Sequence, residues 1–88
     1  MNKKNDRVIR AWLAGVPHSE HGCHTDGVTL WSYALPVAKK LKRKTLVLAV
    51  GSAPTKTTKV LVNQVRATLE EEHKSFTLAT ERHEQWQN

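Results

Sequence analysis

The chain has 88 residues, a formal charge of +6 at pH 7 and a single cysteine, Cys23. One domain with one modest core is all that this length accommodates, which excludes a second domain and disfavours an enzyme with a deep cleft. One cysteine excludes an intrachain disulfide, and neither a signal peptide nor the roughly 20 apolar residues of a membrane helix are found, so we expect a non-enzymatic cytoplasmic protein.

The N-terminal residues 1–6 are polar and charged, and we expect them to be disordered. One folded domain is then predicted over residues 7–75, followed by a C-terminal tail over residues 76–88. That tail either adds an edge strand around Phe76–Thr80 or stays flexible until it binds a partner.

Two strands are predicted in the first half of the chain. Arg7–Ala14 alternates well enough for a strand, which Gly15 ends. Val16–Gly27 is rich in turn-forming residues and predicts a long loop that closes with an Asp-Gly turn. Val28–Leu35 is rich in β-branched and aromatic residues, which predicts a second strand paired with the first as a hairpin.

The segment Pro36–Arg43 fits two interpretations. A proline at a first helical position allows a short helix, whereas a proline bulge allows an extended segment that turns at the lysines. We favour the extended form because five basic side chains would repel one another on so short a helix. Thr45–Val50 is apolar on both faces and predicts either a strand that is covered on both sides or a central strand under the helix.

A helix is predicted after the break at Gly51–Thr55. Lys59–His73 carries apolar residues at helical spacing, and Thr57 or Thr58 is the expected N-cap. The predicted fold class is therefore α+β, a small three-stranded and mostly antiparallel sheet packed against one long helix in the C-terminal half. The open edges of such a sheet favour a homodimer.

The basic residues form two clusters, one within the first ten residues and a denser one at Lys39–Lys44, whereas the last third of the chain is acidic on balance. Such an asymmetry is typical of a protein that approaches a polyanion from one side, although a solvated lysine-rich surface explains it equally well. We expect the phosphate backbone of DNA or RNA to contact Lys39, Lys40, Lys42, Arg43, Lys44, Lys56 and Lys59.

The corner between the predicted strand and helix, VGSAPTKTT, is not a phosphate-binding P-loop. That motif requires glycines where this chain has Val50 and Thr55. We interpret the threonines mainly as helix caps, with a nonspecific phosphate contact at Lys56 and Lys59 as the alternative.

Four residues of metal-ligand type lie within seven positions, namely His18, His21, Cys23 and His24. All are good ligands for zinc, but their spacing matches no zinc-finger signature, so the alternative is a polar exposed loop. Trp12, Trp31 and Tyr33 also allow two interpretations, as core residues or as platforms on which unpaired bases stack.

The stretch Thr25–Tyr33, with the sequence TDGVTLWSY, is followed by Pro36-Val37-Ala38 and later by Thr57-Thr58 and Asn63. This pattern resembles a family of small uncharacterised proteins carried by bacteriophages and other mobile elements. The resemblance covers Val8–Arg66 and implies a β-rich domain with one helix, an intracellular setting and a viral or plasmid accessory gene. It carries over no activity.

The leading functional hypothesis is a small basic accessory protein that associates with nucleic acid through phosphate contacts. The alternative is an inhibitor or adaptor that contacts a host protein through Pro17–His24 or through the tail. A zinc-binding domain is the third hypothesis.

Overall fold

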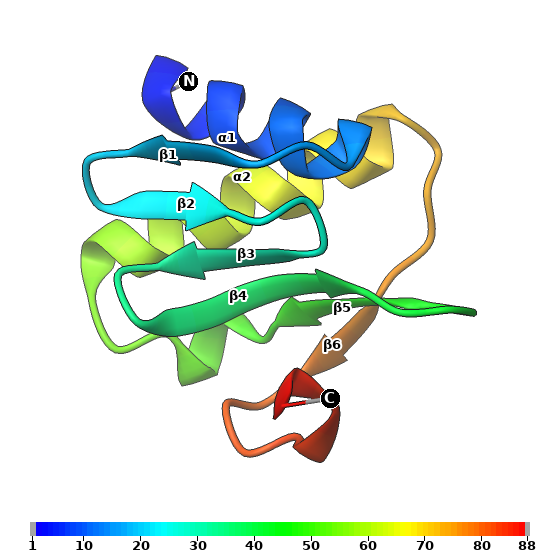
Figure 1. The fold of residues 1–88 in the computed structure, drawn as a ribbon. Helices are drawn as coiled ribbons and strands as arrows, with labels where there is room; N and C mark the ends of the chain where they lie inside the picture. Colours follow the sequence, from blue (N-terminus) through cyan, green and yellow to red (C-terminus); the bar gives the residue numbers. More distant parts are fainter. Residues whose placement is uncertain (1, 88) are drawn as a thin grey trace.

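In the computed structural model, which describes residues 2–87, a helix is followed by five strands, a second helix and a last strand (Figure 1). The helices and strands are α1 (Lys3–Ala14), β1 (His18–Glu20), β2 (Cys23–Thr25), β3 (Thr29–Ser32), β4 (Leu35–Lys40), β5 (Thr45–Leu48), α2 (Lys56–Glu71) and β6 (Thr77–Ala79). Two short 3-10 helices, η1 (Val50–Ser52) and η2 (Glu84–Gln87), follow β5 and β6.

All six strands form one sheet in the order β1-β2-β3-β4-β5-β6. The first five are antiparallel neighbours, and β6 pairs in parallel with β5 after the chain has crossed over through α2. The α+β class is confirmed, but the predicted number of three strands is wrong. Strands β1, β2 and β6 have only three residues each, too few to produce a periodic sequence signal.

Helix α1 replaces both the disordered N-terminus and the first strand that we predicted. Asn2 is its N-cap and accepts a hydrogen bond from the backbone N–H of Asn5, and Gly15 ends the helix with φ at 77°. The buried side chains Val8, Ile9 and Trp12 are spaced for one helical face. The prediction of a strand at Arg7–Ala14 failed because the helix begins before Arg7, and its capping signal lies in residues that were assigned to disorder. Of the predicted disordered residues 1–6, Met1 lies outside the described residues.

The predicted loop Val16–Gly27 contains the β1–β2 hairpin. Its closing Asp-Gly turn is confirmed, since the Asp26 carboxylate accepts hydrogen bonds from the backbone N–H groups of Val28 and Thr29, both at 2.8 Å. The second predicted strand is β3, and its neighbours are β2 and β4 instead of Arg7–Ala14. The extended interpretation of Pro36–Arg43 is confirmed by β4.

The strand–break–helix segment is close to its prediction. β5 is largely buried and lies between β4 and the edge strand β6, and the apolar stripe of the following helix is buried at Leu61, Val62, Val65 and Leu69. Helix α2 nevertheless starts earlier than predicted, because Thr55 is its N-cap and accepts from the N–H of Thr58 at 3.2 Å. Neither Thr57 nor Thr58 has that role.

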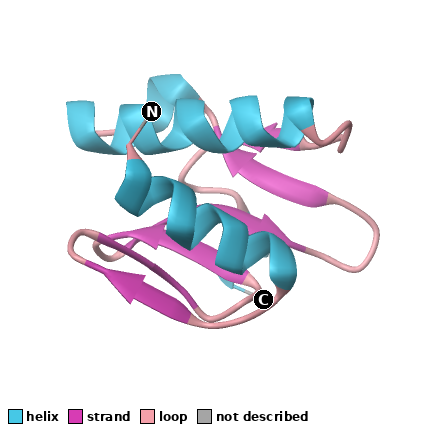
Figure 2. Ribbon diagram, turned by 90° about the horizontal axis from the view of Figure 1, so that it is seen from above, coloured by secondary structure: helices cyan, strands magenta, loops and turns pink. Residues whose placement is uncertain are grey.

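Both helices lie on the same face of the sheet (Figure 2). α1 contacts β1, β2 and β3, whereas α2 contacts β4 and β5, and the two helices also contact each other. On the opposite face, η2 places the buried Trp86 near β4, where the Lys39 ammonium donates to two backbone carbonyls of η2. Neither helix within residues 2–87 is long and apolar enough to cross a membrane.

Candidate functional site

A shallow groove lies at one end of the sheet, between the β4–β5 turn and the segment that joins α2 to β6. The backbone of both segments can be followed in Figure 1. These two segments are about 30 positions apart in the chain, and the fold brings them side by side. We call this the basic groove; its lining residues are Leu41, Lys42, Arg43, Lys44, Thr45, His73, Lys74 and Ser75.

Local geometry exposes the cations of the basic groove. The turn is closed by a hydrogen bond from the N–H of Leu41 to the carbonyl of Lys44 at 2.8 Å, and the Leu41 side chain packs against the core. The three basic residues of the turn, Lys42, Arg43 and Lys44, are consequently exposed.

The other wall of the groove follows from how α2 ends. His73 adopts the left-handed conformation with φ at 57°, and the N–H of Lys74 donates to the carbonyl of Leu69 at 2.8 Å. This pattern closes a helix C-terminus and turns the chain sharply toward the next element. Because the chain turns there, Lys74 lies beside the β4–β5 turn.

Two of the three glutamates at the end of α2 pair with a cation outside the groove. Glu71 and Glu72 face Arg10 of α1, with N–O distances of 4.0 and 3.6 Å. Within residues 2–87, no salt bridge involves Lys42, Arg43, Lys44 or Lys74. The positive charge of the basic groove is therefore available to an anion from solution.

Two of the lysines that were predicted to contact phosphate form hydrogen bonds within the protein instead. Lys39 is only 6% exposed, and its ammonium donates to the carbonyls of Gln85 and Trp86, each at 3.1 Å. The Lys40 ammonium donates to the carbonyl of Trp12 and lies 5.8 Å from the centroid of the Trp12 ring. Both side chains hold other parts of the fold against β4.

Lys56 and Lys59 lie at the other end of the molecule from the basic groove. They belong to the first turns of α2, whose 16 residues span about 24 Å. Lys56 lines a small separate cavity together with Asn2, Asn5, Thr57 and Val60, next to the start of α1. The predicted cationic residues thus form two separate surfaces.

The predicted metal ligands are not brought together. His18 bonds to Glu20, the Cys23 thiol donates to the side-chain oxygen of Asn5 at 3.5 Å, and His24 stacks on Trp31. Among residues 2–87, no three His, Cys, Asp or Glu side chains gather in a way that would hold a metal ion. Burial raises the pKa of the Cys23 thiol, which disfavours the thiolate that a metal requires.

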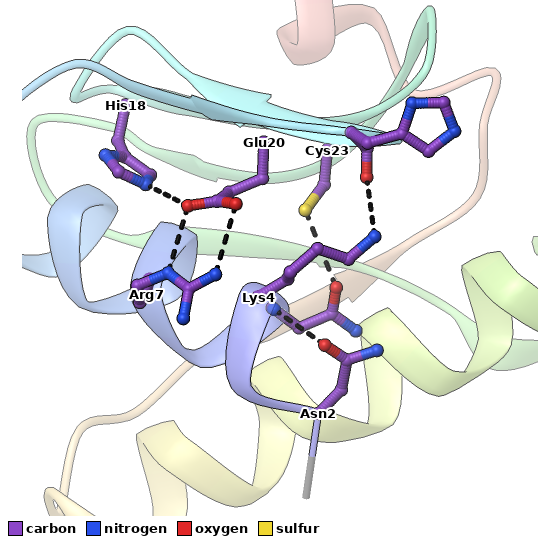
Figure 3. Close-up of polar contacts among 8 residues, drawn as sticks. Asn2, Lys4, Arg7, His18, Glu20 and Cys23 are labelled. Atoms are coloured by element: carbon purple, nitrogen blue, oxygen red, sulfur yellow. Dashed lines mark hydrogen bonds and ion pairs between the residues drawn. The ribbon is translucent and has the colours of Figure 1, made fainter.

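A polar cluster connects α1 to the edge strand β1 (Figure 3). The Glu20 carboxylate accepts two hydrogen bonds from the Arg7 guanidinium, at 3.0 and 3.2 Å, and lies 2.7 Å from Nε2 of His18. The Arg7 and His18 hydrogen bonds lower the pKa of Glu20 to about 2. Nearby, the Lys4 ammonium donates to the carbonyl of His21 at 3.3 Å. The cluster holds a helix on the sheet edge.

The three aromatic residues that the sequence offered as stacking platforms, Trp12, Trp31 and Tyr33, have different environments. Trp12 is fully buried and donates its indole N–H to the carbonyl of Val28 at 2.8 Å, so it is a core residue. Trp31 is partly exposed and stacks on His24, with ring centroids 5.0 Å apart and planes inclined by 17°. Tyr33 is 61% exposed at the β3–β4 turn, where its φ is 54°.

Sequence reasoning missed two residues of the basic groove, His73 and Lys74. They directly follow three glutamates, so this stretch of the sequence is acidic on balance and does not stand out as basic. Only the pairing of β6 with β5 places them beside the lysine-rich turn, and a three-residue strand gives no sequence signal for that pairing.

Comparison of the chain with protein-family models, with curated proteins and with solved structures gives no match.

Proposed function

We propose that this protein is a non-enzymatic accessory protein that binds nucleic acid through phosphate contacts in the basic groove. The observation that carries the proposal is the convergence of Lys42, Arg43, Lys44 and Lys74 on one groove without a salt bridge to any of them within residues 2–87. Phosphates spaced along a strand are the natural counter-charge for such a row of cations.

The proposal revises the set of contacting residues. It retains Lys42, Arg43 and Lys44, adds His73 and Lys74, and omits Lys39 and Lys40 because their ammonium groups are already bonded within the fold. Lys56 and Lys59 form the separate surface, and they serve as the internal control.

Two double variants with equal loss of charge test the proposal. Lys42→Ala with Lys44→Ala removes two cations from the groove, and Lys56→Ala with Lys59→Ala removes two cations from the other end. Affinity for labelled DNA and RNA is measured by fluorescence anisotropy over a series of salt concentrations.

For the wild-type protein we expect affinity that falls steeply with salt. The groove variant should bind more weakly, and its slope of log affinity against log salt should be smaller by about 1.4 for single strands or 1.8 for duplex. The control variant should stay close to wild type. Equal effects of both variants would show attraction by net charge alone, and absence of binding by the wild type would overturn the proposal.

A further inference from the structure

Trp31 and His24 form an aromatic stack on the face of the sheet opposite the helices. The directly paired residues Cys23 and Ser32 face the helices, since Cys23 bonds to Asn5 of α1 and Ser32 lies 2.9 Å from the Thr58 hydroxyl of α2. Side chains alternate along a strand, so the adjacent pair His24 and Trp31 faces the other way.

This part of the sheet face is uncovered within residues 2–87. The C-terminal segment covers the face at Lys39 of β4 and Ala79 of β6, through Trp86. The stack lies on β2 and β3, beyond that cover, and both of its residues are partly exposed.

Trp31 differs from the other two tryptophans in its hydrogen bonding. Trp12 and Trp86 are buried, and each donates its indole N–H to a backbone carbonyl at 2.8 Å. The indole N–H of Trp31 donates to no group in the described part of the chain. Tryptophans that serve the core normally find such a partner, so we interpret Trp31 as a surface residue, one face of whose ring lies against His24.

We infer that the His24–Trp31 stack binds an unpaired base, and that the nucleic acid proposed above is single-stranded. The inference rests on the proposed function. Trp31 pairs with Pro36 of β4, and Leu41 at the edge of the basic groove lies five positions further along the chain, about 17 Å at strand spacing. The C-terminal segment covers β4 at Lys39, between these two positions, so a strand whose phosphates occupy the groove must pass around that segment to reach the stack. The roughly 4–16 nucleotides that single-strand binders cover are long enough for such a path.

Base pairing decides between the two forms of nucleic acid. In a duplex, the bases are stacked on each other and their faces are inaccessible to a side chain. An unpaired base of any type can stack its face on an aromatic ring. Such stacking adds to the salt-dependent binding free energy that comes from the phosphate contacts. The structure thus leads to a preference for single strands without strong sequence preference, for DNA and RNA alike.

The test uses the full chain with oligothymidine and oligouridine of about 12 nucleotides, the length of a typical single-strand site, and a duplex of equal length. Trp31→Ala is compared with Trp31→Phe, which keeps an aromatic face, and with Val60→Ala, an exposed position on α2. Circular dichroism and thermal unfolding establish that each variant is folded, and anisotropy gives the affinities.

We expect Trp31→Ala to weaken single-strand binding about 5- to 150-fold and to leave duplex binding unchanged. Trp31→Phe and Val60→Ala should bind both ligands nearly as the wild type does. A base that stacks on Trp31 should quench the tryptophan fluorescence of the wild type when single strands bind. Because the other two tryptophans, Trp12 and Trp86, are buried, Trp31→Phe should bind single strands without that quenching.

The outcomes separate this inference from the proposed function. Unchanged single-strand affinity in Trp31→Ala, with the effect of the groove variant intact, would overturn base stacking and leave the phosphate contacts standing. Equal losses for single strands and duplex would also overturn it, since they indicate a general structural effect. Absence of binding by the wild type would overturn both.

Discussion

At the turn between β2 and β3, Gly27 has a backbone φ of +97°, a conformation that residues with a Cβ rarely adopt. A Cβ at this position would lie 2.6 Å from the carbonyl oxygen of Gly15, in the segment that ends α1. The glycine is therefore required twice, once for the turn and once for the close approach of two chain segments. The sequence indicated the turn, but the contact with Gly15 depends on the fold.

Replacing Gly27 should destabilise the protein strongly. We expect Gly27→Ala to lower the free energy of unfolding by about 2–4 kcal/mol, as left-handed strain and overlap with Gly15 add together. Gly51→Ala is the matched control, because Gly51 has no positive φ and a Cβ at that position would have no atom within 4 Å. Urea unfolding followed by circular dichroism measures both; similar values for the two variants would contradict the prediction.

At the scale of elements, α1 is held on the sheet by apolar burial along one face and by the Arg7–Glu20–His18 cluster along its edge. β1 is an edge strand of three residues with a single neighbour, β2, so its hydrogen bonds alone fix it weakly. The cluster adds charge-assisted bonds between β1 and α1. This explains why a segment without apolar residues forms a strand where the sequence predicted a loop.

The Glu20 cluster should make stability depend on pH in the acidic range. The pKa of Glu20 in the folded protein is about 2, below its ordinary value of 4.5, so its contribution is complete above pH 4.5 and is lost as the pH falls toward 2. We expect Glu20→Gln to be less stable than the wild type at neutral pH, and the difference to shrink as the pH falls through this window. Urea midpoints at a series of pH values measure it, and a difference that is constant with pH would contradict the assignment.

At the scale of the whole molecule, the chain distributes its charge between two ends. The basic groove gathers Lys42–Lys44 and Lys74 at one end, and Lys56 and Lys59 lie at the other. The sequence shows the excess of positive charge and its densest cluster at Lys39–Lys44. The prediction, however, placed all seven phosphate-contacting residues on one surface. Strand pairing and the length of α2 divide them, and burial removes Lys39.

The C-terminal segment covers part of the sheet face that the helices leave open, at β4 and β6. Trp86 is 7% exposed and lies against β4 and β6 through the Lys39 bonds and the hydrogen bond to Thr80. We expect Trp86→Ala to lower the free energy of unfolding by roughly 3 kcal/mol, since it removes a large buried ring from a small core. Gln87→Ala, at the exposed neighbouring position, should change it by less than about 0.5 kcal/mol. Thermal unfolding of the two variants decides, and equal stability would show that the segment is dispensable.

The sequence by itself determined the elements whose signals are local: the apolar strand β5, the amphipathic face of α2 and the Asp26-Gly27 turn. Their residues carry the necessary periodicity or turn chemistry within a few positions. The sequence favoured the extended form of β4 but left a short helix open. Helix α1 also has local signals, an N-cap at Asn2 and apolar residues at helical spacing, but the cap lies in the residues that were assigned to disorder. Tertiary structure alone decided that β1 and β2 exist, that the tail adds β6 instead of staying flexible, that Lys39 is buried and that Lys74 joins the basic groove. Each of these depends on a partner distant in the chain, and contacts at long sequence separation leave no local pattern by which to predict them.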